Sequence, residues 1–183
     1  MNSEVISSRY AKALLAFTTE TGSGSKVYSQ AVAIVQIMQE VSQLRAFVLI
    51  HDIPLEKKIQ LLSTAICEPL AEDLEKFITL VSSKRRMEMF DVMLLSYISR
   101  YRQANNIKVG SLLTAAPNEH LKQSLETIFS SRTVSQVQLE AEVDPALLGG
   151  FIFEMDGYRM DASVRTRLEK IRQALVDDRG RIV

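Results

Sequence analysis

The feature of this chain that most constrains its fold is a change of hydrophobic pattern near Asn105. Before it, apolar residues recur every three or four positions, which is the spacing of amphipathic helices. After it, segments such as 137–141 alternate between apolar and polar residues, as half-buried strands do. We therefore predict a mainly α fold, with an N-terminal six-helix bundle in residues 1–105 followed by a small α+β domain in residues 106–183.

Six amphipathic segments precede the change of pattern, separated by residues that favour turns. Their apolar stripes begin at Ile6, Val27, Leu44, Leu55, Leu70 and Phe90, and the sixth segment is predicted to be the longest helix. Cys67 is the only cysteine and follows the apolar side of the fourth segment. We expect it to be a buried thiol, because a lone cysteine cannot form an internal disulfide and behaves as a small apolar residue.

The last third of the chain carries the strongest local signals. Asp156-Gly157 follows a short apolar run and predicts a tight hairpin, since a type I′ turn needs positive φ at both central residues. Gly149-Gly150 allows a chain reversal that other residues resist. Asp161 and Ser163 are competing N-caps for a final helix. The apolar face of that helix comprises Val164, Leu168, Ile171 and Leu175.

Composition excludes several classes of function. The chain has 183 residues, with 22 basic and 22 acidic side chains, which argues against a dominant attraction to nucleic acid or anionic lipid. Four basic residues in the final helix, Arg165, Arg167, Lys170 and Arg172, raise the alternative of a DNA-reading helix, but the regular apolar stripe disfavours it. With neither a signal pattern nor an apolar run of membrane-spanning length, we expect membrane association only through partners.

Convergent reactive groups are not evident in the sequence. His51 and His120 lie in different domains, and the sequence has neither an HExxH motif nor paired CxxC motifs for zinc. Asp144, Asp156 and Asp161 are explained by turns and caps rather than by a metal site, and the basic run 84–86 by the end of the fifth helix. We predict a protein that is not an enzyme and has no cofactor; an enzyme with a non-obvious site is the alternative.

The first and fifth predicted helices carry more apolar residues than one stripe requires. The excess on the fifth helix includes Leu80 beside Phe77 and Val81, and the first helix adds Ala11, Leu15 and Ala16 to its main stripe. Such a surplus indicates either a broad contact in the core or a groove for an amphipathic partner helix. The residues alone leave both interpretations open.

Two motifs carry a family resemblance. Arg9-Tyr10-Ala11-Lys12-Ala13-Leu14 opens the chain, and Gly149-Gly150 is followed by the Asp161, Ser163 and Leu168 pattern near its end. Together, in this order, they resemble the delta subunits of bacterial proton-translocating ATP synthases, the family of the mitochondrial oligomycin-sensitivity-conferring protein. The resemblance implies a non-catalytic stator subunit of the peripheral stalk. Its place would be the cytoplasmic face of the bacterial membrane, peripheral, within the complex.

The resemblance also implies two partners. In this family a groove between the first and fifth helices receives the N-terminal helix of an alpha subunit from the catalytic head, which makes the groove candidates Tyr10, Ala13, Leu14, Phe17, Phe77, Ile78, Leu80 and Val81. The C-terminal domain meets the C-terminal ends of the b subunits, which makes the stalk candidates Gly149, Gly150, Phe151, Phe153 and Leu168. The alternative is a generic helical adaptor that binds an amphipathic helix of another partner.

Overall fold

The computed structural model describes residues 2–50, 53–132 and 135–179. The chain divides into two units, Met1–Ala104 and Asn105–Val183, which we call the N-terminal and the C-terminal unit. The first is helical, and the second combines helices with a four-stranded sheet. The protein is therefore mostly helical with a small sheet toward its C-terminus, and the predicted boundary after residue 105 falls beside the division between the units.

The described residues of the N-terminal unit form α-helices joined by short turns. They are α1 (Asn2–Thr21), α2 (Gly24–Glu40), α3 (Ser42–Leu49), α4 (Leu55–Ala65), α5 (Glu72–Ser83) and α6 (Phe90–Ala104), with the 3-10 helix η1 (Met87–Met89) before α6. The prediction that the sixth segment is the longest was wrong, because α1 has 20 residues and α6 has 15. The predicted sixth helix is shortened because residues 84–86 turn and η1 takes up three more positions.

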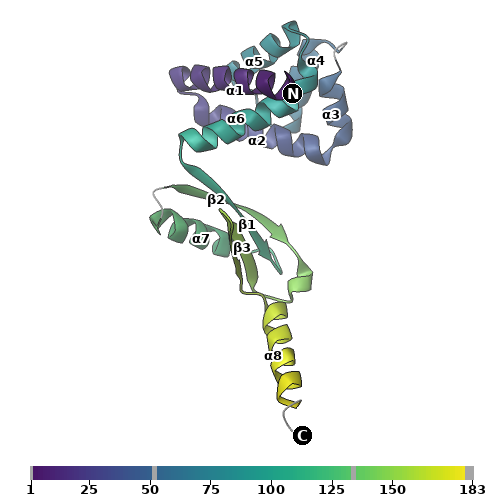
Figure 1. Ribbon diagram of the computed structural model, residues 1–183. Coiled ribbons are helices and arrows are strands. Elements are labelled where there is room, and N and C mark those ends of the chain that lie inside the picture. The colour runs from purple at the N-terminus through teal and green to yellow at the C-terminus, as the bar shows by residue number, and fades with distance from the viewer. Residues whose placement is uncertain (1, 51–52, 133–134, 180–183) are drawn as a thin grey trace. The chain divides into compact units, whose positions relative to one another are not determined.

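Helix α6 supplies much of the core of the N-terminal unit and packs against both α1 and α2 (Figure 1). Phe90, Met93, Leu94 and Tyr97 are completely buried along one face of α6. The hydroxyl of Tyr97 lies 3.4 Å from the hydroxyl of Thr18 on α1, which gives this polar group a partner inside the core. Burial raises the pKa of the Tyr97 phenol.

Cys67 differs from its prediction. Helix α4 ends at Ala65, and Cys67 adopts a positive φ of 56° in the turn that follows. Its side chain is exposed instead of buried. The turn comes two residues before Pro69, and a proline disfavours helical backbone just before it. The helical spacing that suggested a buried thiol therefore stops before it reaches Cys67.

The C-terminal unit is built on one mixed sheet. Its elements are β1 (Ile107–Thr114), α7 (Glu119–Arg132), β2 (Gln136–Val143), the 3-10 helix η2 (Pro145–Leu147), β3 (Phe151–Met155), β4 (Tyr158–Asp161) and α8 (Val164–Arg179). The strand order is β2-β1-β3-β4. β1 and β2 are parallel, with α7 as the crossover that a parallel pair needs, and the other two pairings are antiparallel.

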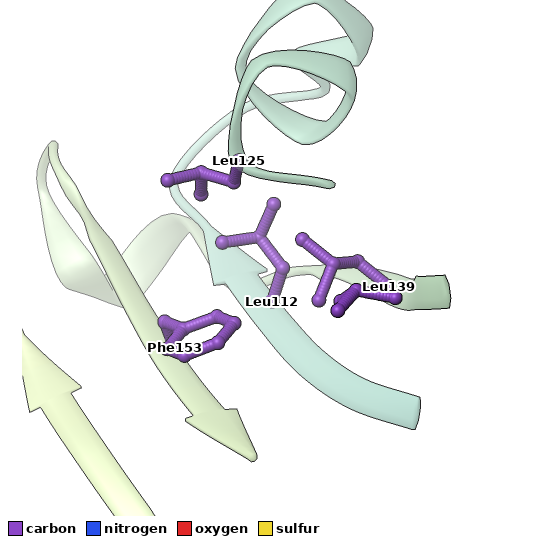
Figure 2. Close-up of a cluster of buried hydrophobic side chains, with 5 residues drawn as sticks. Leu112, Leu125, Leu139 and Phe153 are labelled. Atoms are coloured by element: carbon purple, nitrogen blue, oxygen red, sulfur yellow. The ribbon is translucent and has the colours of Figure 1, made fainter. Parts of the chain in front are cut away.

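One face of the sheet packs against α7 and forms the core of this unit. Figure 2 shows Leu112 on β1, Leu139 on β2 and Phe153 on β3 gathered beneath Leu125 of α7. The ring of Phe153 also stacks on Phe129 of α7, with 4.4 Å between the ring centroids. This cluster holds three strands to one helix by apolar burial.

The predicted hairpin is present, and its turn has the expected backbone. Asp156 and Gly157 have φ values of 50° and 80° between β3 and β4, as a type I′ turn requires. Lys108 Nζ donates a hydrogen bond of 2.6 Å to the Asp156 carboxylate, which joins the turn to the start of β1. The sequence signal at this turn was therefore sufficient to locate it.

The start of α8 is fixed by side-chain caps. Ser163 Oγ accepts from the backbone N–H of Thr166, so Ser163 is the N-cap. Asp161 accepts from the backbone N–H of Ser163 and from the hydroxyl of Thr166. These hydrogen bonds, with the Ser163 backbone first, lower the pKa of Asp161 to about 2.

Within the described residues, none of the helices is by itself both long and apolar enough to cross a membrane. Helices α2 and α3 reach that criterion only when taken together, and they are bent by 113° at their junction.

Candidate partner-binding sites

Helix α5 has two adjacent apolar stripes with different surroundings. Leu74, Ile78 and Val81 are completely buried and form the stripe that faces the core. Phe77 and Leu80 each lie one position away from this stripe, and neighbouring residues on a helix point about 100° apart. The second stripe therefore faces sideways, toward α1.

A depression of about 220 Å³ lies between the two helices. Its lining defines the α1–α5 groove: Tyr10, Ala13, Leu14 and Phe17 from α1, with Asp73, Lys76, Phe77 and Leu80 from α5. Leu14 and Phe77 are buried, whereas Phe17 is 37% exposed and Leu80 is 45% exposed. The groove thus combines an apolar interior with accessible apolar side chains, which is the kind of surface that receives the apolar face of a helix.

Tyr10 is held in the groove by contacts from two directions. Its ring meets Phe77 edge to face, with 6.4 Å between the centroids. Arg86 Nη1 donates a hydrogen bond of 3.0 Å to the Tyr10 hydroxyl, and its guanidinium carbon lies 5.5 Å from the ring centroid. These contacts give part of the basic run 84–86 a structural role beside the groove.

Asp73 joins the end of α1 to the start of α5. Its Oδ2 accepts hydrogen bonds of 2.5 Å from the hydroxyls of Ser23 and Thr21. Those two bonds, Ser23 first, lower the pKa of Asp73, so the carboxylate remains charged at neutral pH. One turn along α5, Lys76 pairs with Glu72 at 2.6 Å, and that hydrogen bond raises the pKa of Lys76.

The structure brings together six of the eight groove residues predicted from the sequence. The assignment of Ile78 and Val81 to the groove is corrected, because both side chains are completely buried in the core and neither lines the groove. Sequence reasoning also missed Asp73 and Lys76. Their positions in the sequence could have indicated them. Asp73 precedes Phe77 by four residues and Lys76 precedes Leu80 by four, so each lies on the same helix face as an apolar groove residue.

The stalk candidates occupy different environments. Phe153 is only 4% exposed and belongs to the core beneath α7, so its assignment as a partner contact is corrected to a packing role. Phe151 is partly buried and packs against the same cluster. Leu168 lies on α8 and is 52% exposed. Of these three side chains, Leu168 is the most accessible to a partner.

Gly149 and Gly150 serve a close approach within the C-terminal unit. Gly150 has a φ of 74°, and a Cβ at this position would lie 2.2 Å from the carbonyl oxygen of Ala162. A Cβ on Gly149 would lie 2.9 Å from Val164 Cγ2. The Gly149 carbonyl accepts a hydrogen bond from the N–H of Val164. The two glycines therefore allow the start of α8 to sit directly against the β3 entry.

The apolar face predicted for α8 is exposed. Figure 1 shows α8 leaving the end of the sheet near η2 instead of covering a sheet face. We call its four apolar residues the α8 stripe: Val164 at 40% exposure, Leu168 at 52%, Ile171 at 51% and Leu175 at 61%. A regular stripe of large apolar side chains in solvent is typical of surfaces that bind another molecule.

The other polar candidates have local structural roles. Asp144 accepts from the N–H of Ala146, Asp156 pairs with Lys108, and Asp161 accepts from the N–H of Ser163, the N-cap of α8. In the part of the chain that the structure describes, no three His, Cys, Asp or Glu side chains are grouped to hold a metal ion. His51 lies outside the described residues.

Comparison with known proteins decides the family. The model of the ATP synthase delta (OSCP) subunit family matches residues 6–175. The chain belongs to this family. It is 36% identical to ATP synthase subunit delta of Phocaeicola vulgatus and 34% identical to that of Bacteroides fragilis, with 98% of both chains covered in each comparison. The family resemblance seen in the two sequence motifs is thus confirmed.

A more distant solved structure has the same fold. It is a chain in the Toxoplasma gondii mitochondrial ATP synthase hexamer, with 19% sequence identity and a TM-score of 0.59. The match covers 93% of this chain and 97% of that one. As a member of the delta (OSCP) family, the chain is a non-catalytic structural subunit of an ATP synthase.

Proposed function

We propose that this delta-family subunit is a stator connector, which holds the catalytic head of a proton-translocating ATP synthase to the peripheral stalk. A rotating central shaft exerts torque on the head, so the head turns with the shaft unless a second connection resists it. Such a connector needs two separate binding surfaces and no chemistry of its own. The α1–α5 groove and the exposed face of α8 are two such surfaces, and they lie in different units.

The observation that carries the proposal is the α1–α5 groove. Helices α1–α6 act in this proposal as a six-helix bundle that presents the groove to the N-terminal helix of an alpha subunit. Phe17 and Leu80 remain accessible while Leu14 and Phe77 are buried, so a helix seated there buries further apolar surface. Burial contributes about 25 cal/mol per Å² before the costs of ordering the partner are subtracted. Binding should therefore be mainly apolar.

The second surface is assigned to the b subunits. Leu168 is the predicted stalk contact with an exposed side chain, and Gly149, Gly150 and Phe151 support it by fixing how α8 leaves the sheet. In this arrangement the subunit sits on the cytoplasmic face of the bacterial membrane. In this proposal its attachment to the membrane is through the complex.

Reattachment of the head tests the proposal. Membrane vesicles that retain the b subunits but lack the head and this subunit are mixed with purified head, with or without the full chain. We expect head sedimentation and ATP-driven proton pumping to require the chain, while ATP hydrolysis by the free head stays unchanged. Equal recovery of pumping without the chain would contradict the connector role.

A further inference from the structure

The exposed stripe on α8 has the spacing of a coiled-coil seam. Its members, Val164, Leu168, Ile171 and Leu175, are separated by four, three and four residues. Alternating steps of three and four place apolar residues at the a and d positions of a heptad, with Leu168 and Leu175 at a. The stripe is about 16 Å long at 1.5 Å per residue. This is a narrow seam that suits one partner helix, not a broad apolar face.

The positions beside the seam are basic. In the same heptad, Arg165 and Arg172 occupy e positions and Arg167 occupies a g position, and we call these three residues the flanking arginines. All three are exposed. Among the described residues, none of their guanidinium groups forms an ion pair. The acidic residue between Val164 and Leu175, Glu169, lies at a b position away from the seam.

We propose that α8 pairs in a coiled coil with a partner helix that carries acidic residues at the positions flanking its own apolar seam. Residues at e and g face the partner's flanks, so their charges decide which helices pair and which repel. A second copy of this chain would place arginine against arginine in either orientation. The partner is therefore a different helix with acidic flanks. Only the identity of the natural partner rests on the proposed stator function: in that case the partner would be the helical end of a stalk b subunit.

A basic amphipathic helix also suits an anionic membrane surface, but the stripe favours a helix. Interfacial helices bury an apolar face, commonly of Trp, Phe or Leu, at the boundary between headgroups and acyl chains. The α8 stripe is only one residue wide at each turn. In the sequence, the next d position after Ile171 is Asp178, so the apolar heptad pattern ends at Leu175. The apolar face of a helix that lies on a membrane is not expected to follow a heptad pattern.

Two designed peptides test the proposal with the full chain. Each has three heptads with Leu and Ile at the seam; one carries Glu at every e and g position and the other carries Lys. We expect the Glu peptide to bind at least about tenfold more tightly than the Lys peptide. Salt should weaken the preference. Leu168→Asp should abolish binding of both peptides, whereas Leu95→Asp on α6 should not.

Charge reversal provides the decisive arm. The triple variant Arg165→Glu, Arg167→Glu, Arg172→Glu should prefer the Lys peptide, provided circular dichroism shows that helix content is retained. Equal binding of both peptides, no binding of either, or an unchanged preference in the triple variant would overturn the proposal. The proposal would also be overturned if the chain bound anionic phosphatidylserine vesicles and did not distinguish the Glu peptide from the Lys peptide. None of these results involves the α1–α5 groove, so the proposal can fail while head binding through that groove survives.

Discussion

Replacing Leu80 by alanine and by aspartate should weaken head binding in two graded steps. Leu80 is 45% exposed in the groove, so a partner helix can bury only that remaining fraction of its side chain. Full burial of a leucine contributes about 1.5–3 kcal/mol, and a little under half of this is about 1 kcal/mol. The Leu80→Ala variant should therefore bind an alpha-subunit N-terminal peptide roughly fivefold more weakly.

The aspartate variant adds a second cost. A carboxylate placed beneath a partner helix loses water without gaining a hydrogen bond, which costs at least the roughly 1–3 kcal/mol of an unpaired neutral polar group. Leu80→Asp should then weaken binding by at least about 2–4 kcal/mol, or by at least roughly 30- to 700-fold. Since nearly half of Leu80 is exposed in the free protein, its replacement should change the free energy of unfolding by only about 1 kcal/mol.

Isothermal titration calorimetry of the full chain with the peptide measures both steps. Leu95 on α6 provides a matched control, because it is also a leucine, is 46% exposed and lies outside the groove. Leu95→Asp should leave the Kd unchanged. An equal loss of affinity in Leu80→Asp and Leu95→Asp, or no loss in either with both proteins folded, would refute the assignment of the groove.

Three further predictions concern packing, pH and reactivity. Phe153→Ala should destabilise the C-terminal unit by about 3–5 kcal/mol, because the ring is buried and stacked on Phe129. Urea denaturation monitored by amide hydrogen exchange should show this loss of stability, while binding to the groove persists. Full protection of the sheet amides in the variant would argue against the prediction. The contribution of Asp161 to α8 should be complete above pH 3.8, the unperturbed value, and disappear as pH falls toward its folded pKa of about 2; Asp161→Asn, which keeps the oxygen acceptor but does not titrate, should lack this pH dependence in NMR signals of α8. Cys67 should react with a disulfide reagent in the native protein nearly as fast as in urea, since it is exposed, and strong protection of the thiol would contradict its position in the turn.

The local elements were predictable where one short segment determines the backbone. Asp156-Gly157 requires a type I′ turn whatever surrounds it, and the structure has that turn. The alternation in 137–141 indicated β2 for a similar reason, since one side of the strand faces the core. The end of α4 was less clear, because apolar residues continue at helical spacing up to Ile66 while the backbone already turns toward Pro69.

The binding surfaces were only partly predictable, because a helical pattern shows that a face is apolar but not what covers it. On α5, the sequence could not separate the core residues Ile78 and Val81 from the groove residues Phe77 and Leu80. The difference is a rotation of about 100° that depends on how α1 and α6 pack against the helix. On α8 the stripe was predicted, but its exposure follows from the path of the helix away from the sheet.

The central claim is that the α1–α5 groove binds a partner helix, and chemical-shift mapping tests it most directly. The isotopically labelled full chain is titrated with the N-terminal segment of the alpha subunit from the same organism. The account predicts saturable one-to-one binding, with the largest amide and methyl shifts at Ala13, Phe17, Lys76 and Leu80. Saturable binding with shifts confined to α3, α4 or α8, or no shifts at all in a folded protein, would contradict it.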